Sequence, residues 1–188
     1  MAALAQTQTA DESALRDLPQ GKSCDWTAMD SMVDQMTPNG STNQPIGLVW
    51  GRQSLVGGGP FSAPSINHDS TYKQVIILHS DRLNKQDRWY GDGYHTSAAV
   101  DNRMYQTGSG AGTCANFKNA STDKVTNIIY TIQVNTDNEP TSTLLQNCAS
   151  SEDTAPKGQK FYLLTSASQI LDVFNKIGTE PTQLRIAK

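Results

Sequence analysis

Histidine and aspartate residues in the middle of the chain are the side chains whose types could do chemistry. They occupy the segment from residue 68 to residue 95: His68, Asp69, His79, Asp81, Asp92 and His95. Imidazole and carboxylate groups gathered at one edge of a sheet could bind Zn²⁺ and activate a water molecule, as in a metal-assisted hydrolase. Their spacings match no known ligand motif, so the alternative is that they lie in solvated loops. The chain has no Gly-x-Ser-x-Gly elbow, P-loop or Rossmann fingerprint.

The apolar segment Val75–Leu78 predicts the strand that would position these groups. Its four apolar residues, three of them β-branched, show no alternation with polar residues. That pattern indicates a strand buried on both faces, as in a parallel sheet covered by helices. The sequence turns polar directly afterwards, at His79, Ser80 and Asp81. Because ligands of open α/β sheets bind beyond the carboxyl ends of the strands, we expect Ser80 and Asp81 at a functional site, beneath the polar, aromatic loop Gln86–His95.

Strand and helix signals alternate along the chain and predict an α/β fold. Two further strands are expected at residues 127–134 and 160–165. Helices are expected at about residues 26–36, 44–55, 97–105, 114–120, 140–148 and 170–177. This alternation predicts an open, mostly parallel sheet flanked by helices, with right-handed crossovers. Few good strands are visible, which suggests that another strand is missing upstream.

Two of the expected helices have informative apolar positions. The last is amphipathic, with apolar residues at i, i+3, i+4 and i+7: Ile170, Val173, Phe174 and Ile177. In the helix at residues 44–55, Ile46, Val49 and Trp50 are expected to share one face. Gly47 and Gly51 would permit close approach to a neighbouring element.

Length and composition favour one domain of ordinary charge. The chain has 188 residues, of which 18% are charged, and a net charge of -3. These values do not suggest a nucleic-acid-binding protein, which usually has a basic patch. No apolar stretch reaches the ~18 residues of a membrane span. Residues 1–22 are expected to form a flexible lead-in. It includes Ala3-Leu4-Ala5-Gln6, which is similar to a signal-peptidase site but lacks the preceding basic and apolar regions.

The three cysteines, Cys24, Cys114 and Cys148, do not form a metal-binding pattern, because no CxxC occurs. Cys114 is expected at the start of one helix and Cys148 at the end of another, on either side of the second strand. If these helices adjoin, the two thiols could form a disulfide; the alternative is two buried thiols. Cys24 is expected to be free.

Several segments occur in an order that resembles a known family. They are Gly40–Gln44 with Ile46–Gly51, Val75–Asp81, Asn84–Gly91, Cys114–Lys118, Ile129–Ile132, Leu144–Ser150 and Gln183–Ile186. Together they resemble the von Willebrand factor A domain at the C-terminus of TadG-like proteins of bacterial Tad (Flp) pilus assembly. We therefore interpret residues 23–188 as a partial von Willebrand factor A-like domain with a Rossmann-like sheet.

The resemblance implies a metal-ion-dependent adhesion site in degenerate form. In the family, an Asp-x-Ser-x-Ser follows the first strand, a Thr comes from a later loop, and an Asp from a Thr-Asp-Gly loop. Thr42 matches the Thr, Asp81 the Asp, and Ser80 the Thr of the last motif. Nothing in residues 1–25 matches the first part, so the first strand is expected to be missing. Because Mg²⁺ takes about six oxygen ligands, binding should be weak or absent, with Arg82 pairing with Asp81 instead.

The resemblance also implies a non-enzymatic protein-binding and adhesion module. The partner would be a pilus or cell-envelope protein, and the location the periplasm or cell surface. Candidate partner contacts lie in the loop after the first strand: Arg82, Trp89, Tyr90, Asp92 and Tyr94. The alternative for the aromatic residues is that they cover the end of the sheet. Two other functions remain open: the metal-assisted hydrolase, and a truncated product held together as a homo-oligomer through an exposed sheet edge.

Overall fold

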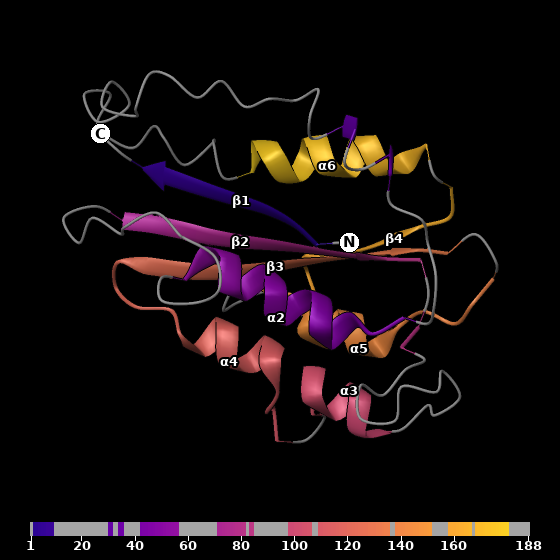
Figure 1. Ribbon diagram of the computed structural model, residues 1–188, viewed down its shortest axis with the longest axis horizontal. Coiled ribbons are helices and arrows are strands. Elements are labelled where there is room, and N and C mark those ends of the chain that lie inside the picture. The colour runs from indigo at the N-terminus through magenta and orange to yellow at the C-terminus, as the bar shows by residue number, and fades with distance from the viewer. Residues whose placement is uncertain are drawn as a thin grey trace.

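A computed structural model describes residues 2–9, 30–31, 34–35, 42–56, 71–81, 83–84, 98–106, 109–135, 138–151, 158–166 and 168–180. Within these residues the apolar segment predicted as a strand forms the middle of β2, Thr71–Ser80. Its neighbours are β1, Ala2–Thr9, and β3, Val125–Val134, and β4, Phe161–Leu164, lies beyond β3. The strand order is β1-β2-β3-β4 (Figure 1).

Strands β2, β3 and β4 are parallel, and β1 is antiparallel to β2. Ser80 at the end of β2 lies opposite Gln133 of β3, and Thr131 of β3 lies opposite Phe161 of β4. The open, mostly parallel sheet that the sequence predicts is therefore confirmed. The strands begin earlier than predicted at β2 and β3, because main-chain pairing continues past the apolar residues.

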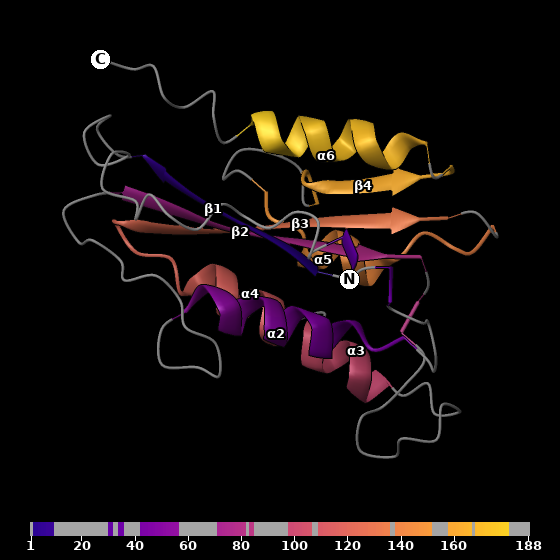
Figure 2. The same ribbon diagram turned by 45° about the horizontal axis from the view of Figure 1, so that its top comes forward.

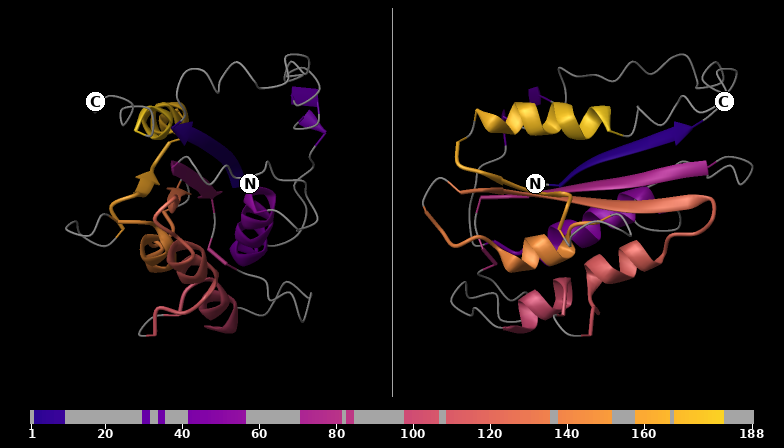
Figure 3. Two further views of the ribbon diagram at one scale, coloured as in Figure 1. Left: turned by 90° about the vertical axis from the view of Figure 1, so that its left-hand side faces the viewer. Right: turned by 180° about the vertical axis from the view of Figure 1, so that it is seen from behind.

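Helices cover both faces of this sheet (Figures 2 and 3). Four of them share one face: α2, Gln44–Leu55; α3, Ala98–Met104; α4, Thr113–Asn119; and α5, Thr143–Cys148. On the other face lies α6, Gln169–Thr179. The predicted helix at residues 26–36 falls mostly outside the described residues.

The unbroken apolar run in β2 contributes to both halves of the core. Ile76 and Leu78 point to the α2–α5 face and pack in a cluster with Phe117 of α4. Val75 and Ile77 point to the opposite face and belong to the cluster that α6 covers. All four side chains are at least nine-tenths buried. Burial of each contributes roughly 1.5–3 kcal/mol, so β2 is a main source of stability.

The face of α2 that contains Ile46, Val49 and Trp50 is exposed. The prediction that these three residues share one face is confirmed, and this face points away from the sheet. The stripe that packs against β2 contains Leu48, Gly51 and Leu55 instead. The reason lies at the start of the helix, where the side-chain amide of Gln44 donates a hydrogen bond to Ser80 at 3.0 Å. Because α2 has apolar residues on more than one side, this buried contact decides which side faces the sheet. Gly47 has open space where a Cβ would lie, so it does not mediate a close approach.

A strand in the expected N-terminal lead-in differs from the sequence prediction. Residues 1–22 were predicted to be flexible, yet Ala2–Thr9 pair with β2 along its whole length, from Ala2 opposite Leu78 to Thr9 opposite Thr71. Alanine and glutamine have weak β-propensity, so the local sequence does not predict this strand. The unpaired backbone groups along the edge of β2 provide the physical reason, since β1 satisfies them. This edge of β2 is thus paired with β1, and the predicted homo-oligomer through an exposed sheet edge stays a prediction.

Candidate functional site

The carboxyl ends of the parallel strands meet at one edge of the sheet, which is where the sequence predicts the site. Ser80 ends β2 and Asp81 follows it, while Gln133 lies near the end of the neighbouring strand β3. Ser80 is 7% exposed and Gln133 is 1% exposed, whereas Asp81 is exposed. The edge therefore has a buried polar layer beneath an accessible carboxylate.

Hydrogen bonds join the start of α2 to the segment after β2. Besides its contact with Ser80, Gln44 donates its backbone N–H to Oδ1 of Asn84 at 2.8 Å. Asn84 in turn donates from Nδ2 to Oδ1 of Asp101 on α3 at 2.9 Å. The side chain of Asn43 caps α2 by accepting from the N–H of Ile46 at 3.2 Å. These bonds fix the positions of two loops and a helix relative to the end of β2.

A second group of hydrogen bonds holds the segment after β3. The side chain of Gln133 donates to the carbonyl of Pro140 at 3.1 Å and accepts from the N–H of Ser142 at 2.8 Å. Glu139 accepts from the N–H of Leu83 at 3.3 Å, which links this segment to the one after β2. Ser142 also caps α5 by accepting from Leu145. Because a buried polar group is costly unless it is paired, these bonds specify the loop conformation.

The two predicted ligands, Thr42 and Asp81, lie on the two loops that these bonds connect. Thr42 is half-buried and directly precedes the cap of α2, and Asp81 is exposed after β2. The third candidate, Ser80, is oriented differently, because its buried hydroxyl accepts from the Gln44 amide. Hard cations such as Mg²⁺ need about six oxygens, and Thr42 and Asp81 supply too few. The described residues contain no cluster of three or more His, Cys, Asp or Glu side chains suited to a metal.

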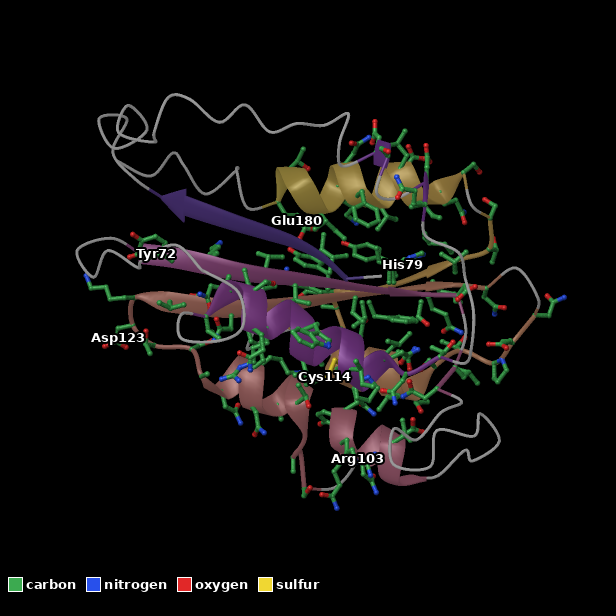
Figure 4. The ribbon with its side chains drawn as sticks, viewed as in Figure 1. Tyr72, His79, Arg103, Cys114, Asp123 and Glu180 are labelled. Carbon is green, nitrogen blue, oxygen red and sulfur yellow. A yellow bond between two sulfur atoms is a disulfide. The ribbon has the colours of Figure 1, made fainter. Side chains whose placement is uncertain are left out.

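His79 is the one histidine of the described residues, and it is half-buried near the end of β2 (Figure 4). Burial lowers its pKa below the ordinary value, and the positive N-terminus lowers it further, while the carboxylate of Asp81 acts in the opposite direction. The imidazole is therefore neutral at pH 7. Its proposed partners in a hydrolase site, His68, Asp69, Asp92 and His95, lie outside the described residues, so that site stays a prediction.

The predicted partner contacts lie outside the described residues: Arg82, Trp89, Tyr90, Asp92 and Tyr94. The expected pairing of Arg82 with Asp81 therefore also stays a prediction.

A disulfide joins Cys114 of α4 to Cys148 of α5, with the two Cα atoms 5.3 Å apart. Both side chains are fully buried in the cluster beneath α2 (Figure 4). The two helices do adjoin on the same side of β3, which is the condition that the sequence analysis set for this bond. Cys24 lies outside the described residues.

A polar cluster on the other face was not anticipated from the sequence. Glu180, just after α6, accepts hydrogen bonds from Tyr130 at 2.6 Å and from Tyr162 at 3.3 Å, and it pairs with Lys160 at 3.4 Å. Burial acts to raise the pKa of Glu180, but the Tyr130 hydrogen bond and the Lys160 charge outweigh it, so this pKa is lowered. Burial, together with the Glu180 carboxylate, raises the pKa of Tyr162 to about 12. The cluster fastens the end of α6 to β3 and β4.

Comparisons with protein-family models, curated proteins and solved structures found no match to this chain. Among the described helices, none has the length and apolar character needed to cross a membrane.

Proposed function

We propose that this chain is a non-enzymatic protein-binding module of the von Willebrand factor A type, whose contact site is the carboxyl edge of its sheet. The order of its sequence motifs resembles that of TadG-like proteins, which suggests a role in pilus assembly or surface attachment. The observation that carries the proposal is the exposed carboxylate of Asp81 next to the buried, hydrogen-bonded pair of Ser80 and Gln44, to which the half-buried Asn84 is also bonded. These bonds hold the end of β2, from which Asp81 follows directly, so the carboxylate starts from a well-ordered strand end.

We propose further that the partner is bound without a tightly held metal ion. Thr42 and Asp81 offer one hydroxyl and one carboxylate, and the Ser80 hydroxyl is already engaged by Gln44. A basic group of the partner would then be the natural counterpart of Asp81, through a charge-assisted hydrogen bond. The Cys114–Cys148 disulfide supports a location in an oxidising compartment, such as the periplasm or the cell surface.

Two measurements test this proposal. Titration calorimetry with Mg²⁺ and Mn²⁺ should give no micromolar binding; binding that disappears in Asp81→Ala would contradict the metal-free site. Labelled protein should bind the cell-envelope fraction of the source organism, and Asp81→Ala should weaken this binding about fivefold or more. Asp123→Ala is the matched control, because Asp123 is an exposed aspartate just before β3 begins, at the opposite edge of the sheet. Equal binding by both variants would refute the contact site.

The hydrolase alternative has a direct chemical check. Elemental analysis of the purified protein by inductively coupled plasma spectrometry should find no stoichiometric zinc. One zinc per chain would favour the hydrolase over the binding module.

A further inference from the structure

Strand β4 lies at the edge of the sheet, with β3 on one side and no other described strand beyond it (Figure 2). Its four residues, Phe161–Leu164, are all apolar or aromatic. Leu164 is buried on the α6 face, whereas the side chain of Leu163 is 42% exposed. Proteins usually protect such an edge with charged residues or proline, because its unpaired backbone groups can pair with another strand. Strand β4 contains neither.

The hydrogen bonds to β3 show which backbone groups of β4 point outward. The carbonyl of Lys160 accepts from the N–H of Thr131 at 3.0 Å. The carbonyl of Leu164 accepts from the N–H of Asn135 at 2.7 Å. Because successive residues of a strand direct their backbone groups to opposite sides, the N–H and C=O of Leu163 point away from β3. Within the described residues, neither group has a hydrogen-bond partner on that side.

The outward N–H groups on either side of Leu163 are bonded within the chain. The N–H of Phe161 donates to the carbonyl of Gly158 at 2.9 Å, in the turn before β4. At the other end, the N–H of Thr165 donates to Oε1 of Gln169 at 2.9 Å. The open part of the edge is therefore short and centred on Leu163, which restricts the register of any strand that pairs with it.

The topology of the sheet disfavours a further strand of the same chain at this edge. The crossovers from β2 to β3 and from β3 to β4 use helices on one face of the sheet and proceed in the same direction across it (Figure 3). Helix α6 lies on the other face. A strand after α6 that paired in parallel with the free edge of β4 would continue in the same direction, so its crossover would have the opposite, left-handed sense, which is rare. The edge is therefore better suited to a strand from another chain.

A second copy of the chain has the matching edge. When two β4 strands lie antiparallel about a two-fold axis at Leu163, the N–H of Leu163 in each copy donates to the C=O of Leu163 in the other. The Cβ atoms of the two exposed leucines then lie about 5 Å apart across the axis, where their side chains can pack. Phe161 of one copy lies opposite Thr165 of the other, so no like charges face each other along the paired segment.

We propose that two copies of the chain associate through β4, which joins their sheets into one across the two-fold axis. The surface does not include Asp81 or α2, so it can be tested separately from the carboxyl edge of the sheet. The proposal gives the homo-oligomer expected through an exposed sheet edge a specific location, at the end of the sheet opposite to β1. Because the paired segment is only four residues long, we expect a dissociation constant of roughly 10–100 μM.

Sedimentation velocity of the full chain over about 5–500 μM tests the association, because this range brackets the expected dissociation constant. The chain has the substitution Cys24→Ser, so that a disulfide through this thiol cannot link two copies. We expect the sedimentation coefficient to rise from that of a monomer to that of a dimer, without larger species, since two-fold pairing of one edge closes the assembly. A monomer at every concentration, or oligomers larger than a dimer, would overturn the proposal.

Variants at Leu163 locate the association on the molecule. Leu163→Lys should weaken the dimer about tenfold or more, because two like charges would meet at the axis. Leu163→Pro should abolish it, because proline lacks the outward N–H while the bonds between β4 and β3 do not use this group. Val49→Lys is the matched control, because Val49 is also 42% exposed but lies on α2; it should have no effect. Unchanged association in Leu163→Lys, or an equal loss in Val49→Lys, would overturn the proposal.

A cysteine at the axis measures the register of the pairing. In the proposed dimer the two Cα atoms of residue 163 lie about 5.5 Å apart, within the range that a disulfide spans. With Cys24→Ser also present, Leu163→Cys should therefore form a covalent dimer on mild oxidation in much higher yield than Val49→Cys. Equal yields, or a higher yield for Val49→Cys, would place the contact elsewhere and overturn the proposal.

Discussion

Helices α2 and α6 cover opposite faces of the same sheet, and their apolar residues are arranged differently. In α6, apolar residues form one stripe that packs on the core through Ile177 and its neighbours, and Leu171 alone of its large apolar side chains is exposed. In α2, Leu48 and Leu55 reach the core while Ile46, Val49 and Trp50 face outward. The stripe of α6 faces the sheet, and the remaining faces of this helix are mostly polar. The outer apolar face of α2 therefore contributes less to the core than the inner face does.

The two faces also differ in how they are fastened. The α2 side contains the Cys114–Cys148 disulfide and the buried Gln44–Ser80 contact. The α6 side is held by apolar packing and by the cluster around Glu180. The disulfide fixes α4 relative to α5, and the Gln44–Ser80 bond fixes the start of α2 relative to the end of β2.

The largest expected effect comes from the covalent link. Replacing both Cys114 and Cys148 by Ala should lower the free energy of unfolding by about 3 to 4 kcal/mol, because the bond closes a loop across 34 positions of the chain. Urea denaturation under non-reducing conditions measures this change. Cys24→Ala is the control and should leave the midpoint unchanged; an equal loss there would show that the pairing is different.

Alanine substitutions on the inner and outer sides of α2 should differ clearly in their effect on the free energy of unfolding. Leu48→Ala should lower the free energy of unfolding by about 3 kcal/mol, since Leu48 is fully buried and a cavity would remain. Val49→Ala, one residue further along and 42% exposed, should change it by less than about 0.5 kcal/mol. Thermal or urea unfolding of both variants tests the difference. A similar loss in the two would mean that the outer face is also part of the core.

Replacing Gly112 and Gly47 by alanine should change the free energy of unfolding in opposite directions. Gly112→Ala should cost about 2 kcal/mol, because its φ of +107° is strained for alanine and its Cβ would collide with Met104. Gly47→Ala should stabilise the protein by up to about 1 kcal/mol, since Gly47 is helical with open space around it. Denaturant midpoints measure both changes. An unchanged free energy of unfolding in Gly112→Ala would show that the backbone between α3 and α4 can shift to accept a Cβ.

The smallest expected effect concerns the fastening of α6 and its dependence on pH. The pKa of Glu180 in the folded protein is lowered from 4.5, so its carboxylate stabilises the fold above about pH 4.5 and loses this effect as the pH falls further. Glu180→Gln should therefore flatten the acid limb of the stability curve. The same variant should lower the pKa of Tyr162 from about 12, measured by absorbance of the phenolate. Unchanged acid and alkaline limbs would show that the cluster does not fasten α6.

The parts of the fold that the sequence predicts well have strong local patterns. Segment 75–78 is continuously apolar and forms the core of β2, and the apolar spacing at 170–177 forms the buried stripe of α6. The position of Ser80 and Asp81 at the carboxyl edge follows from the topology of parallel sheets alone. These predictions need no knowledge of distant contacts.

The parts that the sequence does not predict depend on contacts between distant segments. The apolar residues of α2 lie all round the helix, and its orientation is selected by the bond between Gln44 and Ser80, 36 positions apart. Strand β1 has residues of weak β-propensity and exists because the edge of β2 needs a partner. The cavity beside Trp50 is formed by residues of α2, α3 and α4, which are far apart in the sequence, so no local pattern predicts it.

Strand β1 also has a consequence for the order in which the protein folds. Its residues are synthesised before those of β2, and their partners follow 62 positions later for Thr9 and Thr71 and 76 positions later for Ala2 and Leu78. Loop closure over such a distance has an entropy cost that local helices do not pay, so this pairing should form late. During synthesis, β1 therefore stays unpaired until β2 has emerged from the ribosome. Its backbone groups are accessible to strands of other nascent chains during that time.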